Sequence, residues 1–341
     1  MARKIAINGF GRIGRCVLRI IHDLRDQDLE VVAINDLTKP DMLAHLLQYD
    51  SVHRKFKADV RAEADAIFVD GRRIAVYAEK DAAKLPWKDL GVELVLECTG
   101  RYKTKAEALA HVTAGAAKVI ISAPAKGEDL TCVVGVNDDR LDPVNHQVIS
   151  CASCTTNCLA PLVKVLDDAF GIEHGLVTTV HSYTNDQRLL DLPHDDKRRA
   201  RAAAVSMVPS TTGAASAIGL VVPHLKGKLD GIAVRVPTPD VSLTDLVATL
   251  KRSVTDAEVN AALAAAAAAG PLAGVLAFET NELVSSDFIG SHFSSIVDAA
   301  NTKVIGERMV KVLSWYDNEW GFSCRMVDLS RLFLGLPRAK F

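Results

Sequence analysis

The 341-residue chain lacks three features that would direct attention elsewhere. No stretch approaches the roughly 18 consecutive apolar residues of a membrane span, and Lys4-Ile5-Ala6-Ile7 reads as a strand, so no signal peptide is expected. The formal net charge is −2, so no strong electrostatic field favours nucleic acid or a membrane surface as a partner. We therefore expect a cytoplasmic protein with no membrane partner and no nucleic acid as its primary partner.

The cysteine pattern typical of disulfide frameworks and zinc sites is also missing. The seven cysteines are scattered and odd in number, which in a chain of this length favours reduced thiols. Cys151-Ala152-Ser153-Cys154 has C-x-x-C spacing, but zinc would need a second Cys/His pair at such spacing, so we expect no metal. A redox pair stays open as an alternative, although such pairs are expected on thioredoxin-like units.

The composition and length of the chain predict two domains. Hydrophobic residues make up 49% of the chain, enough for a sizeable core, and 341 residues exceed the usual size of one domain. Up to about residue 150, apolar strands alternate with helical patterns, which predicts an α/β domain with a doubly wound parallel sheet. We expect strands at Ile5–Asn8, Val31–Asn35, Ala66–Val69, Ile74–Ala78, Leu94–Cys98, Val119–Ser122 and Val133–Val136, and helices at Ile13–Asp23, Met42–Leu47, Ala82–Leu85 and Lys105–Ala114.

After Cys154 the strands become longer and the crossovers fewer, which predicts an α+β catalytic domain with a mixed, largely antiparallel sheet. The boundaries expected are 1–153 for the first domain and 154–318 for the second, with a C-terminal helix in about 319–341 packing back on the first. We expect helices at about 155–170, at Ala261–Ala269 and from Ser330, and strands at Gly175–Thr184, Ile232–Pro237, Ser242–Leu250 and from Phe278. The polar stretch Asn185–Arg201 is long enough to be functional or interfacial.

A glycine pattern forms the first candidate site. Gly9-Phe10-Gly11-Arg12-Ile13-Gly14 follows an apolar strand and opens a helical pattern, as in Rossmann-type dinucleotide-binding folds. Its glycines would allow a tight turn and close approach of the backbone to a pyrophosphate. Asp36 ends the next strand, about 20 residues on, where a carboxylate binds the adenosine ribose and would repel a 2′-phosphate. NAD is therefore favoured over NADP, and a plain glycine turn is the alternative.

A thiol forms the second candidate site. Cys154 lies in Ser153-Cys154-Thr155-Thr156-Asn157, just before a stretch spaced like a helix face, which places it on the first turn of a helix. There the unpaired N–H groups and the helix dipole favour negative charge, so the thiol should ionise more easily and act as a nucleophile. Beside a dinucleotide, it indicates covalent capture of a carbonyl carbon followed by hydride transfer. Cys158, on the same helical face, is interpreted as a small buried hydrophobe.

The nucleophile needs a base, and His181 is the candidate. It lies near the end of the strand that follows the helix, and a helix returning into a strand can bring the helix start and the strand end together. The pair would form a thiolate–imidazolium couple that shuttles the proton. A hydrogen-bonded structural histidine is the alternative.

Three features could bind phosphate groups. Arg198, Arg199 and Arg201 lie in the irregular segment after His181, although a solvated basic face is the alternative. Arg235 lies inside an apolar strand, where an unpaired guanidinium is costly and an anionic partner is needed. Thr211-Thr212-Gly213 supplies hydroxyl and backbone donors before a helix start.

Together these motifs resemble the glyceraldehyde-3-phosphate dehydrogenase family, and most closely its bacterial glycolytic type. The resemblance covers essentially the whole chain, and the heptapeptide around Cys154 is highly specific. Its segments are Ile7-Asn8-Gly9-Phe10-Gly11-Arg12-Ile13-Gly14, Ala152-Ser153-Cys154-Thr155-Thr156-Asn157-Cys158, His181-Ser182-Tyr183-Thr184-Asn185-Asp186-Gln187 and Trp315-Tyr316-Asp317-Asn318-Glu319.

The resemblance implies a role for each matching residue. Cys154 would be the nucleophile and His181 the base. The attacking inorganic phosphate would be bound by Ser153, Thr155, Arg199, Thr212 and Gly213, and the C3 phosphate of the substrate by Thr184 and Arg235. NAD would be bound by Gly9, Gly11, Arg12, Ile13, Gly14, Asp36, Lys80, Thr99, Ser122 and Asn318.

The resemblance also implies a homotetramer in which Asn185–Arg201 lines the neighbouring subunit's cofactor site. Leu192-Pro193 in this segment is similar to the NAD-specific branch of the family. Two positions depart from the family pattern. Phe322 replaces the tyrosine usual near the nicotinamide, and Cys151 stands where asparagine is common, which could make the site more oxidisable.

The implied activity is the phosphorylating oxidation of D-glyceraldehyde 3-phosphate to 1,3-bisphosphoglycerate with reduction of NAD, in glycolysis, through a Cys154 thiohemiacetal and thioester. Two alternatives remain. Erythrose-4-phosphate dehydrogenase shares the Cys/His pair, but its loop after the histidine differs and lacks the Leu192-Pro193 pattern. A non-catalytic nucleotide- or RNA-binding regulator is less consistent with intact Cys154, His181 and Arg235.

Overall fold

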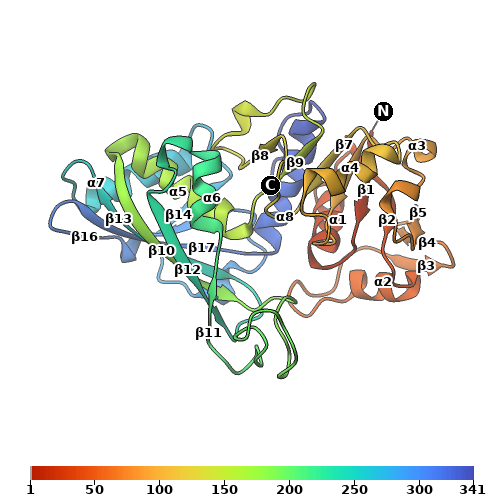
Figure 1. The fold of residues 1–341 in the computed structure, drawn as a ribbon, viewed down its shortest axis with the longest axis horizontal. Coiled ribbons are helices and arrows are strands. Elements are labelled where there is room, and N and C mark those ends of the chain that lie inside the picture. The colour runs from red at the N-terminus through yellow and green to blue at the C-terminus, as the bar shows by residue number, and fades with distance from the viewer. Residues whose placement is uncertain (1) are drawn as a thin grey trace. The chain divides into compact units, whose positions relative to one another are not determined.

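The computed structural model describes residues 2–341, which form two compact units (Figure 1). The first unit contains the chain up to Cys132, Asp139–Ala152 and Ser323–Phe341, and the second contains Val133–Asp138 and Ser153–Phe322. Within residues 2–341, no helix has both the length and the apolar character needed to cross a membrane.

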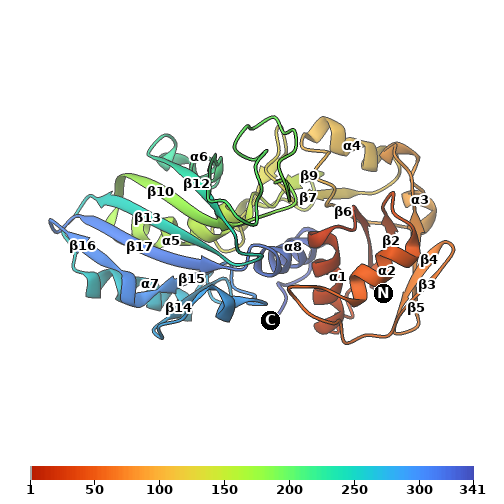
Figure 2. The same ribbon diagram turned by 90° about the horizontal axis from the view of Figure 1, so that it is seen from below.

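A nine-stranded sheet forms the centre of the first unit (Figure 2). Its strand order is β3-β4-β5-β2-β1-β6-β7-β9-β8. Neighbours from β5 to β8 run parallel, whereas β4 pairs antiparallel with both β3 and β5. The strands are β1 (Arg3–Asn8), β2 (Leu29–Asn35), β3 (Val60–Glu63), β4 (Ala66–Val69), β5 (Arg72–Tyr77), β6 (Leu94–Glu97), β7 (Lys118–Ile121), β8 (Leu130–Thr131) and β9 (Val148–Ser150). The helices are α1 (Arg12–Asp23), α2 (Pro40–Gln48), α3 (Trp87–Leu90), α4 (Lys105–Thr113) and most of α8 (Trp320–Phe333), with short 3-10 turns at Ala82–Lys84 and Asp138–Arg140.

Strand β6 shows why these sequences form a parallel sheet. All four of its residues are buried, and Leu94, Val95 and Leu96 are apolar. Such runs are typical of strands that are covered on both faces. The exception is Glu97 at the carboxyl end of β6, which lies in register with Asn8 at the end of β1. The predicted α/β class of this part of the chain is confirmed.

The second unit contains a mixed eight-stranded sheet in the order β11-β12-β10-β13-β17-β15-β14, with β16 paired to β17. The β10–β12 and β14–β15 pairs are parallel and the others antiparallel. Its strands are β10 (Ile172–Ser182), β11 (Val208–Thr211), β12 (Leu229–Val236), β13 (Ser242–Leu250), β14 (Leu276–Glu279), β15 (Ser295–Asp298), β16 (Lys303–Ile305) and β17 (Met309–Tyr316). Its helices are α5 (Cys154–Phe170), α6 (Ala214–Val221) and α7 (Asp256–Ala268). Helix α5 packs against β13, β15 and β17, and the predicted mixed sheet is confirmed.

Two predicted elements were wrong. Val133–Val136 is a turn and not a strand, because Gly135 has a φ of 80° and the Val133 N–H donates to Asn137 Oδ1 at 2.8 Å. The last helix spans Trp320–Phe333, so it begins within the expected segment 319–341 but well before Ser330, and it ends before the C-terminus; it starts early because Asp317 Oδ1 accepts the N–H groups of Glu319 and Trp320.

The first sheet also departs from a wholly parallel arrangement. Strands β4 and β5 form a hairpin, because Asp70 (φ 48°) and Gly71 (φ 78°) both adopt left-handed conformations between them. Such a two-residue turn matches the twist of antiparallel strands.

Candidate active site

Cys154 is the first residue of α5, as the sequence predicted. The helix begins there because the Ser153 Oγ accepts the N–H of Thr156 at 3.0 Å, an N-cap interaction. Cys154 itself is half-buried, so its sulfur lies at the edge of the protein interior.

The predicted pairing of Cys154 with His181 is present. Cys154 Sγ lies 3.4 Å from His181 Nε2. His181 Nδ1 lies 2.7 Å from the carbonyl oxygen of Ser182, which can only accept a hydrogen bond. The shorter of the two contacts of Nδ1, to the Ser182 carbonyl, favours the tautomer with the ring proton on Nδ1, in which the lone pair of Nε2 faces the thiol. This tautomer can take the sulfur's proton.

Arg235 lies beside the imidazole because β10 and β12 are parallel and pair His181 with Arg235 in register. One terminal nitrogen of its guanidinium lies 3.1 Å from His181 Nδ1 and donates to the Ser182 carbonyl oxygen (3.2 Å) and to Thr184 Oγ1 (3.4 Å). Its Nε is buried and has no hydrogen-bond partner within residues 2–341, and no carboxylate of these residues pairs with it. A guanidinium held in this way is prepared for an anion from outside the chain.

Burial sets the charge state of the Cys–His pair. It raises the pKa of the Cys154 thiol, although Arg235 and hydrogen bonds from Thr155 act in the opposite direction. Burial also lowers the pKa of His181 to about 3, helped by the positive charge of Arg235. Both shifts act against the predicted thiolate–imidazolium couple, because burial disfavours the charged form of each group. Desolvation outweighs the effect of the helix N-terminus.

Arg199 has a different environment from Arg235. Its guanidinium forms an ion pair with Asp186 and donates to Ser210 Oγ at 2.7 Å and to the Thr211 carbonyl oxygen at 3.2 Å. These bonds attach the Arg199 guanidinium to the two residues that directly precede Thr212. Its positive charge also contributes to lowering the pKa of His181, so it lies within electrostatic reach of the Cys–His pair.

Tyr316 is a site residue for which the sequence motifs predicted no role. Its hydroxyl lies 2.9 Å from Thr155 Oγ1 and 2.8 Å from Thr179 Oγ1, and its ring packs edge-to-face on His181 at 5.9 Å. It thereby links the start of α5 to β10 behind the Cys–His pair. The inward position of Tyr316 at the end of the alternating strand β17 is the signal that could have identified it.

The remaining predicted residues of the second unit have local partners. Thr212 Oγ1 accepts the N–H of Ala214 at 3.2 Å, and Gly213 is the N-cap of α6. Asn318 is buried, and its Oδ1 accepts a hydrogen bond from Ser242 Oγ at 2.6 Å. No hydrogen bond within residues 2–341 links Thr212, Gly213 or Asn318 directly to Cys154.

The glycine pattern of the first unit forms the predicted turn between β1 and α1. A Cβ on Gly9 (φ 90°) would lie 2.7 Å from the Thr99 nitrogen, and one on Gly14 would lie 2.4 Å from the Gly9 carbonyl oxygen. A Cβ on Gly11 would meet no atom of residues 2–341 within 4 Å. Gly11 is also the N-cap of α1 and offers no side chain for capping. These residues fit a dinucleotide whose pyrophosphate approaches the first turn of α1.

The other predicted cofactor residues follow the carboxyl ends of the parallel strands. Asp36, after β2, accepts the N–H groups of Phe10 and Thr38, both at 2.9 Å. The Arg12 guanidinium forms an ion pair with Asp50, an interaction that its predicted role in cofactor binding did not include. Ile13 lies in the first turn of α1, Lys80 follows β5 and is exposed, Thr99 follows β6, and Ser122 follows β7.

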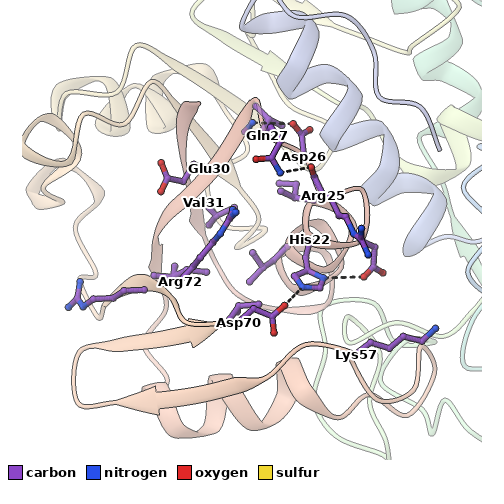
Figure 3. A pocket seen from close by; sticks show the side chains of 16 residues that line it. His22, Arg25, Asp26, Gln27, Glu30, Val31, Lys57, Asp70 and Arg72 are labelled. Carbon is purple, nitrogen blue, oxygen red and sulfur yellow. Dashed lines mark hydrogen bonds and ion pairs between the residues drawn. The ribbon is translucent and has the colours of Figure 1, made fainter. Parts of the chain in front are cut away.

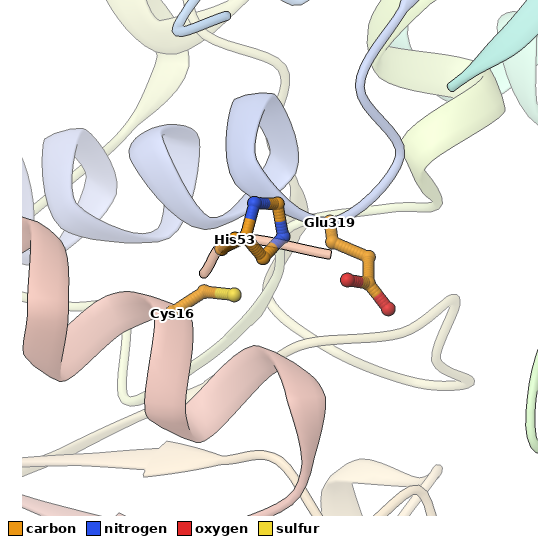
Figure 4. Close-up of side chains that lie close together, drawn as sticks. All are labelled: Cys16, His53 and Glu319. Carbon is orange, nitrogen blue, oxygen red and sulfur yellow. The ribbon is translucent and has the colours of Figure 1, made fainter. Parts of the chain in front are cut away.

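All seven cysteines are free thiols in the structure. Cys158 is buried against Ser295 Oγ at 3.7 Å, and burial raises its pKa to about 11, which matches its interpretation as a buried hydrophobe. Cys16 on α1 is buried beside His53, within 4.8 Å of it (Figure 4).

The first unit also contains a cavity of about 660 Å³, where His22 on α1 lies between Asp23 and Asp70 (Figure 3). None of the predicted cofactor residues lines it. The size of this cavity is therefore no reason to assign the cofactor site to it.

Comparisons with known proteins agree with the geometry. Residues 3–105 match the family model of the glyceraldehyde 3-phosphate dehydrogenase NAD binding domain, and residues 153–318 match that of its C-terminal domain. The chain is 59% identical over 330 residues to glyceraldehyde-3-phosphate dehydrogenase of Geobacillus stearothermophilus, covering 97% of this chain and 98% of the relative. It is 59% identical over 331 residues to the Thermotoga maritima protein of the same name, covering 97% and 99%. Identity to the Streptomyces coelicolor protein is 55% over 335 residues, covering 98% and 99%.

Proposed function

Because this chain belongs to the glyceraldehyde 3-phosphate dehydrogenase family, we propose that it oxidises D-glyceraldehyde 3-phosphate to 1,3-bisphosphoglycerate, with NAD as cofactor and inorganic phosphate as second substrate. The observation that carries the proposal is the Cys154 thiol at 3.4 Å from His181 Nε2, beside the Arg235 guanidinium, whose Nε has no hydrogen-bond partner among residues 2–341. We further propose that the pathway is glycolysis.

The first step is addition of the thiol to the aldehyde. His181 Nε2 takes the thiol proton as Cys154 Sγ bonds to the carbonyl carbon, and the proton passes to the former carbonyl oxygen to give a thiohemiacetal. The Nδ1–H bond to the Ser182 carbonyl keeps the ring in place while Nε2 gains and loses the proton. Because burial disfavours both the thiolate and the imidazolium, we propose that proton transfer to His181 accompanies the attack of the sulfur.

The second step is oxidation of the thiohemiacetal carbon. NAD, when bound, accepts a hydride. His181 takes the proton from the thiohemiacetal hydroxyl, so that the carbon becomes the carbonyl carbon of a thioester with Cys154. The residues proposed to hold NAD are Gly9, Gly11, Ile13, Gly14, Asp36, Lys80, Thr99 and Ser122 in the first unit and Asn318 in the second. Arg12 is proposed to act there through its backbone, since its side chain is bonded to Asp50.

The third step conserves the energy of oxidation. An oxygen of inorganic phosphate attacks the thioester carbon, the carbon–sulfur bond breaks, and the acyl phosphate leaves while His181 returns the proton to sulfur. We propose that Ser153, Thr155, Arg199, Thr212 and Gly213 bind this phosphate, and that Thr184 and Arg235 hold the C3 phosphate of the substrate. Two anion sites beside one carbon would place both reactants within reach of it.

A direct test uses purified protein with NAD and D-glyceraldehyde 3-phosphate. NADH absorbance should rise continuously only when phosphate or arsenate is present. Equal rates without either anion would exclude the acyl-phosphate route. Replacing the substrate by D-erythrose 4-phosphate tests the alternative, and a larger kcat/KM for erythrose 4-phosphate would favour that activity.

We also propose that the protein acts as a cytoplasmic homotetramer. Large apolar side chains are exposed on the segment after β10, where Leu189 is 80% and Leu190 is 76% exposed. Another subunit would cover such a patch. Sedimentation velocity should give a single species of four chains, and a monomer at micromolar concentration would contradict this.

A further inference from the structure

Three neighbouring parallel strands of the first unit end in buried polar residues. Asn35 ends β2, Asn8 ends β1 and Glu97 ends β6, and the three residues lie in register across the sheet. Asn35 Nδ2 donates to Asn8 Oδ1 at 2.7 Å, and Asn8 Nδ2 donates to Glu97 Oε2 at 2.5 Å. All three are at most 6% exposed. A buried polar row of this kind is costly unless every member is satisfied.

Every hydrogen-bond partner of the Glu97 side chain is a donor. Its Oε2 accepts from His111 Nε2 at 3.1 Å in addition to Asn8, and its Oε1 accepts from the Thr99 N–H at 2.8 Å and from the Thr99 hydroxyl. Trp87 Nε1–H donates to His111 Nδ1 at 3.1 Å, so the imidazole is neutral and carries its proton on Nε2. Only a carboxylate accepts all of these bonds.

This network ends in the loops that carry the cofactor residues. Gly9 packs directly on the Cys98–Thr99 peptide, because a Cβ there would lie 2.7 Å from the Thr99 nitrogen, the atom whose N–H Glu97 accepts. At the other end of the row, Asn35 bonds through Oδ1 to the N–H and through Nδ2 to the carbonyl of Glu79, both at 2.9 Å. Ligands of parallel sheets bind at these carboxyl ends.

We propose that Glu97 is a positioning residue for the NAD site, whose carboxylate joins the glycine turn after β1 and the Thr99 turn after β6 into one rigid cradle. It does not touch the reacting atoms. Its effect is on cofactor affinity, because the two turns keep the geometry of the bound state before NAD arrives. The inference rests on the NAD site of the proposed function, and NAD binding without substrate tests it separately from turnover.

The isosteric variant Glu97→Gln tests the proposal. In either orientation, the glutamine amide turns its NH₂ group toward existing donors, which are the Thr99 N–H and hydroxyl on one side and Asn8 and His111 on the other. At least one set of bonds is lost while the volume stays the same. Glu93→Gln is the matched control, since Glu93 precedes the same strand and pairs with Arg3 at its other end.

Titration calorimetry with NAD should show a Kd about tenfold higher in Glu97→Gln, the scale of one lost bond to a charged group, and no change in Glu93→Gln. Steady-state kinetics should show the same rise in KM for NAD, with kcat and the KM for D-glyceraldehyde 3-phosphate unchanged. A folded Glu97→Gln protein that binds NAD within about twofold of wild type would overturn the proposal. Where this variant does not fold, Glu97→Asp, whose shorter carboxylate reaches one set of donors only, is judged by the same criteria.

A spectroscopic signature separates positioning from loss of stability. The indole N–H resonance of Trp87 reports its bond to His111, and that of Trp315, which donates to Asp298 in the second unit, serves as an internal reference. In Glu97→Gln, the Trp87 resonance should move while that of Trp315 stays. An unmoved Trp87 resonance together with unchanged NAD affinity would reduce Glu97 to a packing residue.

Discussion

Two buried histidines, one in each unit, have opposite uses. His111 has both ring nitrogens bonded to the protein, since Nδ1 accepts from Trp87 and Nε2 donates to Glu97. His181 has only Nδ1 engaged in this way, on the Ser182 carbonyl, and its Nε2 faces the Cys154 sulfur. His111 therefore cannot exchange a proton without breaking a bond, whereas His181 has a lone pair directed at an acidic hydrogen.

Their neighbours differ in charge as well. His111 lies beside the Glu97 carboxylate, and His181 lies beside the Arg235 guanidinium, which adds to burial in lowering the pKa of His181. The comparison shows that burial alone does not separate a structural histidine from a catalytic one. The partners of both nitrogens and the sign of the nearest charge do.

The largest effect should come from removing the sulfur on which His181 acts. Cys154→Ser replaces the thiol by a far less acidic hydroxyl, so kcat should fall on the order of 10⁴-fold or more. NAD binding should remain measurable by calorimetry, since the cradle lies in the first unit. Cys158→Ser is the matched control one turn along α5, and turnover retained by Cys154→Ser would exclude covalent catalysis through this residue.

Replacing each of the two histidines by glutamine separates their roles. His181→Gln removes the base, and kcat should fall about 10²–10⁴-fold with little change in the Kd for NAD. His111→Gln should instead raise the Kd for NAD. The control is His174→Gln, which lies on the same strand as His181 but is exposed. If His111→Gln lowered kcat as strongly as His181→Gln and left NAD affinity intact, the comparison would fail.

Removing the cation beside His181 should affect substrate binding and thiol acidity. Arg235→Leu should raise the KM for D-glyceraldehyde 3-phosphate about 10–100-fold, the scale of lost bonds to a charged group. The Arg235 charge lowers the pKa of Cys154, so the pH midpoint for alkylation of Cys154 by iodoacetamide should move to higher pH in the variant. Arg252→Leu, an exposed arginine of the second unit, should change neither, and an alkylation midpoint that stayed or moved lower would contradict the assignment.

The smallest effect should be on the stability of the first unit. Burial opposes ionisation of Asp50, but hydrogen bonds from Arg12 and from backbone N–H groups lower the pKa of Asp50 from 3.8 to about 2. Since the folded pKa lies below the unfolded one, this stabilisation is present above pH 4 and is lost as the pH falls toward 2. Asp50→Asn should lower the free energy of unfolding by about 2 kcal/mol at pH 7 and by much less at pH 2.

Urea unfolding at the two pH values measures this loss. Asp59→Asn, which removes an exposed carboxylate paired with Arg61, is the matched control. An equal loss in Asp50→Asn at both pH values would show that packing, and not ionisation, is the source of the effect.

The sequence predicted which residues form the Cys–His site better than it predicted the pKa shifts of those residues. The first turn of α5 could be predicted from the apolar spacing that follows Cys154, and strand pairing in the structure brings Arg235 to His181. The directions of the pKa shifts of Cys154 and His181 could not be predicted in this way, because desolvation depends on every atom packed around these side chains. The contact between Glu97 and His111 was not predicted either, because hydrophobic periodicity does not indicate which side chains of a strand and a helix meet.

The most direct test of the account is the intact mass of the protein after mixing with NAD and D-glyceraldehyde 3-phosphate in the absence of phosphate and arsenate. Each chain should gain one 3-phosphoglyceroyl group, which peptide mapping places on Cys154 and which inorganic phosphate removes. A chain that forms NADH yet carries no acyl group, or carries it on another cysteine, would contradict the account.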